Sequence, residues 1–217
     1  QLPFNHPCKV YVDSRKIPSE IHYKLFYTSK FKELVNSLIP NKLGDKVQEE
    51  PRLIIPLIDK ENNLFGIQGR SIDKNSKIRY ITIMLTEDSP KVYGLDTFDS
   101  TKVGYCTEGP IDSMFLPNSI ASCGGDIVSN FSSSGINPTN IVVVYDNEPR
   151  NKETIKKIQK AIDNNLNVCI WPTSIEYKDI NDMILAGITS KDIISTITNN
   201  TYKGLEAKLK LNSWKKI

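Results

Sequence analysis

The sequence predicts an α/β protein in which a sheet with parallel strand pairs carries helices on its faces, preceded by a smaller mixed α+β segment. Two observations predict this class. The second half of the chain alternates short apolar runs with turns and helical patterns, as sheets with parallel pairs do. The first half contains apolar runs joined by a tight polar turn, which is typical of antiparallel strands. The 217 residues are 39% hydrophobic, enough for the core of one large or two small domains.

The first half is expected to begin with little regular structure. Within residues 1 to 50 we predict one or two short helices, such as 29–38, which ends before Pro40 as helices tend to. From Arg52 the runs RLIIPLID and LFGIQGRS predict two strands joined by a hairpin turn at KENN. RYITIML, from Arg79, predicts a third strand, and KVYGLD follows it. We expect these runs to form one antiparallel or mixed β module.

From Val103 the chain alternates strands and helices. Short apolar, β-branched runs predict strands at 103–107, 119–123, 141–145 and 168–171. Helices are expected between and after these strands, after Gly109 and Pro110, near 126–131, over 151–164, in KDINDMILAG and over 192–197.

Charge and cysteine content narrow the setting. The net charge is +3, and the lysines are concentrated toward the two ends of the chain, which is compatible with a polyanion partner, although a solvated lysine face is the ordinary alternative for any one run. No apolar run approaches the roughly 20 residues that span a bilayer, so we expect no membrane contact and a cytoplasmic location. The four cysteines are far apart without a CxxC pair, so we expect core thiols and no zinc. The chain begins at Gln1 rather than Met, so we expect it to be part of a longer protein.

Acidic residues follow the predicted strands of the second half. Glu108 and Asp112 follow the first of these strands, Asp146 and Glu148 the third, and Asp179 and Asp182 the last. Because ligands gather outside the carboxyl ends of strands in open α/β sheets, we expect these acids to converge on one site. Carboxylate oxygens suit Mg²⁺ or Mn²⁺, and two acids one residue apart can bind one ion or neighbouring ions. For Asp112 and Asp182, helix capping is an equally good interpretation.

These residues carry a resemblance to a known family. TEGPIDS followed by VVYDNE resembles the toprim signature, which primases, topoisomerases and some nucleases share. Upstream, RLIIPLID, GIQGRS, RY and KVYGLD occur in the order of conserved blocks of the bacterial-type (DnaG) primase polymerase domain, and ASCGGD and YKDINDMI downstream are also similar to blocks of that family. The resemblance covers roughly residues 52–187, and the DNE motif is most similar to primases of large tailed bacteriophages.

The resemblance implies a toprim fold, Rossmann-like with helices on both faces, over residues 101–200. An α+β N-terminal subdomain that is basic and faces the template would occupy residues 1–100, and a basic C-terminal tail residues 201–217. A zinc-binding module precedes the polymerase domain in the family, so we expect it to lie outside this chain.

The resemblance also implies roles for individual residues. Glu108 matches the toprim glutamate, Asp146 and Glu148 match the acidic pair, and Asp112 matches the aspartate of the first motif. Asp179 matches the first acid of a DPD motif whose second aspartate is replaced here by Asn181, so the last metal ligand is open between Asp179 and Asp182. Four basic residues are expected to bind template and nucleotides: Arg52, Arg70, Arg79 and Lys91. Lys91 is also grouped with the catalytic residues Glu108, Asp146 and Glu148.

The function implied is that of a DNA primase catalytic core. It would synthesise short RNA primers on single-stranded DNA from ribonucleoside triphosphates, using two or more Mg²⁺ or Mn²⁺ ions. A replicative helicase is the expected partner, and the cytoplasm of an infected bacterium is the expected location if a phage encodes the protein. Two alternatives stay open: a toprim nuclease, and a non-catalytic module that binds single strands through bases stacked on Tyr80 or Phe65.

Overall fold

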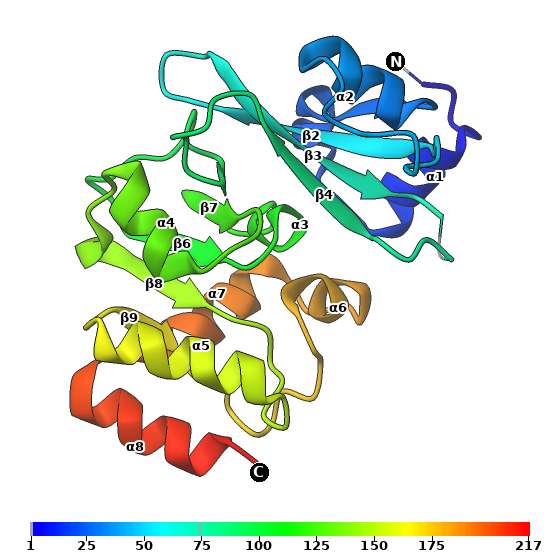
Figure 1. Ribbon diagram of the computed structural model, residues 1–217. Coiled ribbons are helices and arrows are strands. Elements are labelled where there is room, and N and C mark those ends of the chain that lie inside the picture. Colours follow the sequence, from blue (N-terminus) through cyan, green and yellow to red (C-terminus); the bar gives the residue numbers. More distant parts are fainter. Residues whose placement is uncertain (1, 74) are drawn as a thin grey trace.

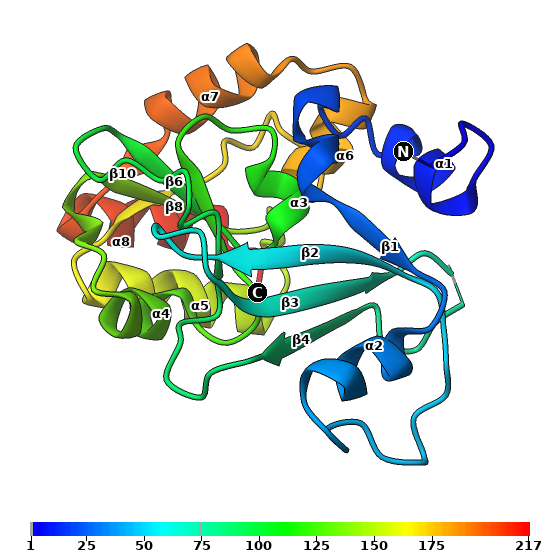
Figure 2. The same ribbon diagram turned by 90° about the horizontal axis from the view of Figure 1, so that it is seen from above.

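The computed structural model describes residues 2–73 and 75–217 and contains two β-sheets (Figures 1 and 2). The first sheet is antiparallel in the order β1-β2-β3-β4. Its strands are β1 (Phe26–Thr28), β2 (Arg52–Ile58), β3 (Leu64–Ser71) and β4 (Tyr80–Met84). The predicted hairpin is confirmed, since β2 pairs with β3 in a register that places Arg52 opposite Ser71.

Helices cover both faces of this first sheet. They are α1 (Pro7–Ser14), the 3-10 helix η1 (Ser19–Lys24) and α2 (Phe31–Leu38). On one face Phe31 of α2 packs with Ile54 and Ile67, whereas on the other face α1 packs with Leu53 and Ile55. Phe31 also explains one glycine of the GIQGRS motif, because a Cβ on Gly69 would lie 2.4 Å from its ring.

The second sheet has the order β10-β9-β8-β6-β7-β5, and its four inner strands are parallel. Its strands are β5 (Val92–Tyr93), β6 (Gly104–Thr107), β7 (Ser119–Ser122), β8 (Ile141–Val144), β9 (Asn167–Cys169) and β10 (Thr201–Tyr202). One prediction is wrong in its placement: the KVYGLD strand was expected in the N-terminal β module, but β5 pairs with β7 at the edge of the second sheet. Local sequence patterns predict a strand without specifying its partner, which is decided by contacts with distant residues.

Helices cover both faces of the second sheet, as predicted. Their bounds are α3 (Pro110–Ser113), α4 (Ile127–Ser134), α5 (Lys152–Asp163), α6 (Ile180–Leu185), α7 (Ser190–Asn199) and α8 (Gly204–Trp214), with a 3-10 turn η2 (Pro138–Asn140) before β8. Alternate residues of β8 point to opposite faces. Val142 and Val144 pack toward α3, α6 and α7, whereas Ile141 and Val143 pack toward α4, α5 and α8.

The two sheets share one apolar core. Leu53 and Ile55 of β2 lie in the same buried cluster as Val144 of β8 and Met183 of α6. The N-terminal sheet is therefore packed against the helical face of the second sheet. All four cysteines are buried free thiols, which confirms that part of the cysteine prediction.

The C-terminal segment differs from the predicted tail. Residues 201–217 contain the edge strand β10 and the helix α8, which packs on α5 with Ala207, Leu211 and Trp214 buried. The lysines of this segment are exposed, which explains why the sequence resembles a basic tail. The domain boundaries near residues 100 and 200 stay a prediction. Within the described residues, no helix combines the length and the apolar character needed to cross a membrane.

Candidate active site

The acids that follow β6 and β8 are neighbours because the two strands are parallel and adjacent. Thr107, the last residue of β6, lies opposite Val144, the last residue of β8. Both strands therefore end at the same edge, and the backbone N–H of Asp146 points to Glu108 Oε1 at 3.5 Å. This edge is the point at which ligands bind in open α/β sheets.

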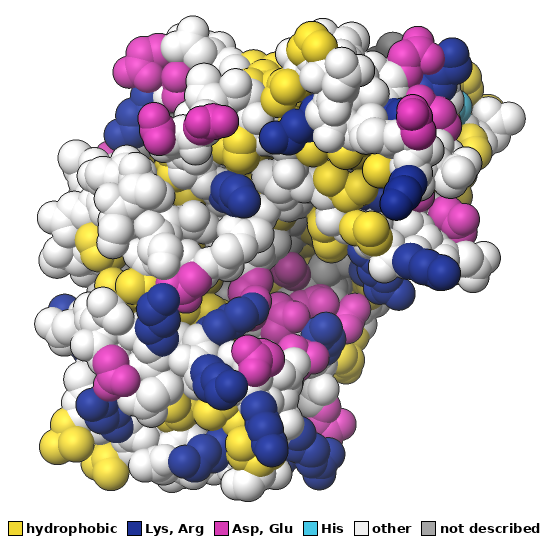
Figure 3. Space-filling view, in the orientation of Figure 1, with side chains coloured by type: hydrophobic (Ala, Val, Ile, Leu, Met, Phe, Trp, Pro, Cys, Tyr) yellow, Lys and Arg dark blue, Asp and Glu magenta, His cyan; other side chains and the backbone are white. Residues whose placement is uncertain are grey.

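A pocket of about 760 Å³ opens between the two sheets at this edge. In Figure 3 acidic side chains gather in the hollow between the upper and lower parts of the molecule, with lysines and arginines around it. The second sheet and its helices contribute five acids to the lining, Glu108, Asp112, Asp146, Asp179 and Asp182. Arg15, Arg70, Arg79 and Lys91 line the same pocket, chiefly from the N-terminal sheet and helix α1. Five of the six predicted metal ligands and three of the four predicted basic contacts thus share one cavity.

Three acids of this pocket have raised pKa values, which means that their ionised forms are disfavoured. Burial, followed by the negative charge of Asp179, raises the pKa of Asp112 to about 7. Burial, followed by the charge of Glu108, raises the pKa of Asp146 to about 7. The pKa of Asp179 is also raised, mainly by burial. A bound cation would remove this penalty, because it favours the ionised form of each carboxyl.

Two lysines balance the acids. Lys157 of α5 forms an ion pair with Glu108. Lys178 Nζ lies 3.6 Å from Asp146 Oδ2 and 3.4 Å from Glu148 Oε1. The ammonium group of Lys178 therefore lies near the carboxylates of both Asp146 and Glu148.

The donor set consists of carboxylate oxygens, which suits Mg²⁺ or Mn²⁺. Within residues 2–73 and 75–217, no three His, Cys, Asp or Glu side chains are already arranged to hold an ion.

Glu148 lies beside the pocket rather than in it. Its Oε2 accepts hydrogen bonds from Asn151 Nδ2 at 3.1 Å and Thr154 Oγ1 at 3.2 Å, at the start of α5. It lines an adjacent pocket of about 550 Å³ together with Arg150 and Trp214. Of the two acids, only Asp146 faces the pocket between the sheets.

Asn181 is buried and holds α1 against the acids. Its backbone N–H donates to Asp112 Oδ1 at 2.9 Å. Its side chain accepts from Arg15 Nη1 at 2.9 Å and donates to the backbone oxygen of Arg15 at 2.7 Å. Both polar atoms of the side-chain amide are thus hydrogen-bonded to Arg15, and Asn181 contributes no carboxylate to the site.

Helix capping falls to Asp179 rather than to Asp182 or Asp112. Asp179 is the N-cap of α6, since its Oδ1 accepts from the backbone N–H of Asp182 at 2.8 Å. Asp182 and Asp112 lie inside the first turns of α6 and α3, so neither is the capping residue itself. For Asp182 capping was one of two equally good interpretations, and the structure gives the capping contact to Asp179.

Tyrosines hold the arginine on the opposite wall. Arg70 Nε donates to the Tyr11 hydroxyl at 2.9 Å, and its guanidinium lies 4.4 Å from the centre of the Tyr80 ring. Burial raises the pKa of Tyr80 to about 12, so this hydroxyl stays protonated. Such stacking fixes the orientation of the guanidinium. Arg79 and Lys91 are exposed at the rim of the same wall.

Arg52 requires a correction, because the structure removes it from the predicted nucleic-acid contacts. Its side chain is 0% exposed. It donates to the backbone oxygens of Gly69 at 2.7 Å, Ile78 at 2.8 Å and Arg79 at 3.3 Å, and it pairs with Glu50. A guanidinium whose donors are used inside the sheet cannot reach a phosphate.

The sequence analysis did not identify three residues that the structure places at the site, Arg15, Lys157 and Lys178. Lys178 directly precedes Asp179 in the YKDIND motif, a signal that could have been used. Lys157 is one of several lysines in the predicted helix 151–164, a pattern that is typical of a solvent-exposed face. Arg15 lies in an N-terminal segment without a strong pattern, and its partner Asn181 is 166 residues away.

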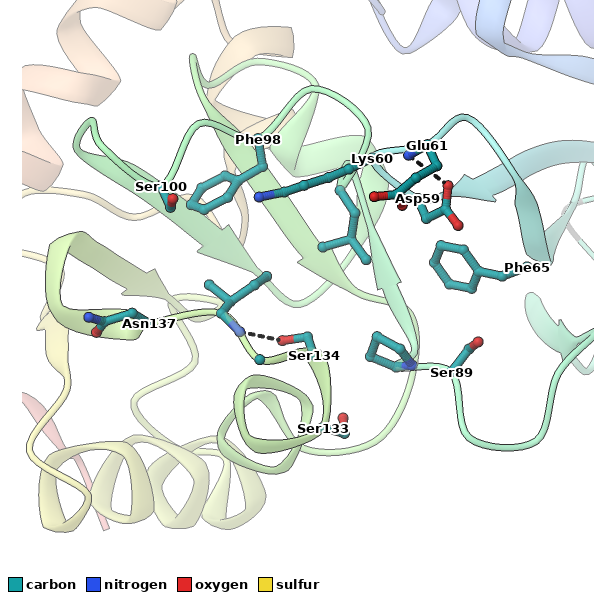
Figure 4. A pocket seen from close by; sticks show the side chains of 14 residues that line it. Asp59, Lys60, Glu61, Phe65, Ser89, Phe98, Ser100, Ser133, Ser134 and Asn137 are labelled. Carbon is teal, nitrogen blue, oxygen red and sulfur yellow. Dashed lines mark hydrogen bonds between the residues drawn. The ribbon is translucent and has the colours of Figure 1, made fainter.

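A further pocket of about 440 Å³ lies away from these acids (Figure 4). Phe65 and Phe98 line it together with the serines at the end of α4. Its two acids, Asp59 and Glu61, both belong to the turn of one hairpin, where hydrogen bonds from Asn63 lower the pKa of the Asp59 carboxyl. This pocket therefore has no carboxylates brought together from separate strands, unlike the site between the sheets.

The chain is similar in sequence to a known protein. The chain is 36% identical over 222 residues to the DNA primase of Enterobacteria phage T4, which matches all of this chain and 63% of the phage protein. The chain therefore spans less than two thirds of the length of that relative. No protein-family model matches the chain.

Solved structures show the same fold. The Aquifex aeolicus primase, comprising zinc-binding and RNA polymerase domains, superposes with a TM-score of 0.69 at 19% identity over 97% of this chain and 60% of its own. The E. coli primase catalytic core gives a TM-score of 0.67 at 16% identity over 98% of this chain and 78% of its own. The chain is therefore similar in sequence to the phage T4 DNA primase and has the fold of the bacterial primase catalytic core.

Proposed function

We propose that this chain is a primase catalytic core that synthesises short RNA primers on a single-stranded DNA template by metal-dependent nucleotidyl transfer. One observation carries the proposal: acids from the ends of adjacent parallel strands face an arginine-bearing wall across one pocket. Acids and arginines that face each other are what a metal-bound triphosphate requires, since the ion needs carboxylates and the phosphates need guanidinium or ammonium groups. The nuclease alternative is not favoured by similarity to primases, and neither is the non-catalytic one.

The acids are assigned to the metal. We propose that Glu108, Asp146 and Glu148 hold Mg²⁺ or Mn²⁺, with Asp112, Asp179 and Asp182 as the remaining candidates for two or more ions. When bound, the metal supplies positive charge that activates the attacking hydroxyl and neutralises the leaving phosphate oxygens. Lys178 and Lys157 occupy the positive positions beside these carboxylates in the absence of an ion.

The basic wall is assigned to nucleic acid and nucleotide. Arg70 is oriented by Tyr11 and Tyr80, whereas Arg79 and Lys91 are exposed and can contact phosphates of template or ribonucleoside triphosphate. A related structure is that of the DnaG primase catalytic domain bound to ssDNA, with a TM-score of 0.64 at 16% identity over 98% of this chain. By family resemblance a replicative helicase is the proposed partner and the cytoplasm the proposed location.

The test replaces the acid that faces the pocket. Asp146→Asn keeps the shape of the side chain and removes its charge, and Asp163→Asn makes the same change at an exposed carboxyl that pairs with Lys208 on the outer side of α5. Primer synthesis is measured on single-stranded DNA with ribonucleoside triphosphates and Mg²⁺, using the chain with any further domains that its gene encodes. We expect Asp146→Asn to abolish synthesis while retaining its circular dichroism spectrum, and Asp163→Asn to be fully active. Full synthesis by Asp146→Asn would refute the assignment, and DNA cleavage without nucleotide consumption would favour the nuclease.

A further inference from the structure

Asn147, which lies between the two acids of the DNE motif, makes contacts that neither acid makes. Its backbone N–H donates to the backbone oxygen of Lys178 at 2.6 Å. Its side-chain Nδ2 donates to the backbone oxygens of Ile175 at 2.8 Å and Tyr177 at 3.1 Å. One residue therefore fixes the backbone of the segment that carries Lys178, the amine shared by Asp146 and Glu148.

The remaining polar atom of Asn147 is held by the C-terminal helix. Asn147 Oδ1 accepts a hydrogen bond from Trp214 Nε1 at 3.2 Å. Trp214 is 5% exposed and belongs to the core formed by α4, α5 and α8, so its ring is fixed by packing. Two residues further along the chain, the backbone N–H of Lys216 donates to the backbone oxygen of Pro149 at 2.8 Å. The end of the chain is thus attached to the loop that carries the acids.

The acid loop is held at alternate residues. Trp171 Nε1 donates to the backbone oxygen of Tyr145 at 2.8 Å. The anchored positions are therefore residues 145, 147 and 149, and the residues between them are Asp146 and Glu148, whose carboxylates both reach Lys178. The hydrogen bonds at residues 145, 147 and 149 restrict the separation of the two carboxylates without involving the carboxylates themselves.

We propose that Asn147 and Trp214 are a pair of positioning residues that set the separation of Asp146 and Glu148 and the location of Lys178 beside them, and thereby set the affinity of the site for a divalent cation. This inference rests on the proposed function, in which these carboxylates hold the ion. Neither residue contacts the ion or the nucleotide. α8 and the residues that follow it reach the acid loop through the hydrogen bond to Asn147 and the contact at Pro149.

The competing interpretation is that Trp214 only fills the core and that its indole N–H takes the nearest acceptor. The two interpretations predict different measurements. A purely structural role lowers the free energy of unfolding and leaves the affinity for metal unchanged. A positioning role lowers the affinity for metal in a protein that is still folded.

The experiment uses Trp214→Phe, which keeps an aromatic ring in the core and removes the N–H donor together with part of the indole ring system, and Asn147→Ala, which removes the acceptor and the Nδ2 donor. Ser213→Ala is the matched control, since Ser213 Oγ donates only to the backbone oxygen of Leu209 on the exposed side of the same helix. Binding of Mn²⁺ is titrated by the electron paramagnetic resonance signal of the free ion, and folding is checked by circular dichroism and urea denaturation. Removing residues that orient metal ligands commonly weakens metal binding about tenfold or more.

We expect Trp214→Phe and Asn147→Ala each to raise the dissociation constant for Mn²⁺ about tenfold, with Ser213→Ala unchanged. The Mg²⁺ concentration for half-maximal primer synthesis should rise by the same factor, while the KM for template stays the same. Wild-type affinity in both variants, with or without a loss of stability, overturns the inference and leaves the proposed function intact. Absence of Mn²⁺ binding by the wild-type protein overturns both together. If Asn147→Ala does not fold, Trp214→Phe decides alone.

Discussion

Replacing Arg52 by alanine should destabilise the protein severely without removing a contact to nucleic acid. The side chain is fully buried and makes donor bonds to three backbone oxygens and one to Glu50. Its guanidinium also lies 5.0 Å from the centre of the Phe31 ring, on the helix that covers this face of the sheet. Alanine would remove the guanidinium donor from Gly69 O and Ile78 O, whereas Arg79 O keeps the backbone N–H of Ser71, and it would open a cavity beneath Phe31.

The expected loss follows from these contacts. Removing one partner of a buried ion pair costs about 3–5 kcal/mol, and an unpaired buried carbonyl costs about 1–3 kcal/mol. Glu50 keeps contact with water because its side chain is 29% exposed, so the lower end of the first range applies and the carbonyls dominate. We expect a loss of at least about 3 kcal/mol out of a typical total of about 5–15 kcal/mol.

The assay is urea denaturation followed by circular dichroism. With a slope of about 2–3 kcal/mol per molar urea for a chain of this length, the midpoint should fall by about 1 M or more. Arg79→Ala is the matched control, because Arg79 is exposed at the start of the neighbouring strand and its loss should change stability by less than about 0.5 kcal/mol. Under the proposed function Arg79→Ala should instead weaken binding of single-stranded DNA and lower its salt dependence by about one charge. An unchanged midpoint for Arg52→Ala, accompanied by weaker binding of DNA, would refute this reasoning and restore Arg52 to the binding surface.

Two further predictions concern the acids and the thiols. Because the pKa values of Asp112 and Asp146 are raised to about 7 from about 3.9 in an unfolded chain, the folded protein binds more protons between these values, and its stability should fall as the pH rises from about 4 to about 7. Mg²⁺ should therefore raise the Tm more at pH 8 than at pH 5 in scanning calorimetry, and an equal effect at both pH values would contradict the metal assignment. Burial raises the pKa of the Cys8 thiol to about 11 and also raises the pKa of Cys106, Cys123 and Cys169. A thiol reagent such as DTNB should react with these four only after unfolding, and rapid reaction of any of them in the native protein would show that its burial is incomplete.

The sequence by itself determined most of the strands and helices between residues 52 and 200 and the edge at which the acids lie. Short β-branched runs such as 141–145 were sufficient because residues two apart in a strand face the same core, so burial on both faces requires an unbroken apolar run. Glu108 and Asp146 could be placed together because each directly follows such a run, and parallel neighbouring strands end at the same edge. These are local or nearly local properties of the chain.

The tertiary structure alone decided which charged residues are available at the site. Arg52 and Arg79 are both arginines at strand starts, yet one is buried by Phe31 and the other is exposed. Glu148 turns toward the start of α5, and Lys178 lies between it and Asp146.

The orientation of the other site residues depends on contacts between residues that are far apart in the chain. Asn181 is joined to Arg15 across 166 positions, and Asn147 to Trp214 across 67. No local pattern encodes such pairings, because they form only once tertiary packing brings α1 and α8 against the acid loops. The sequence therefore locates the carboxylates, whereas packing decides how each one is oriented and which residues hold it there.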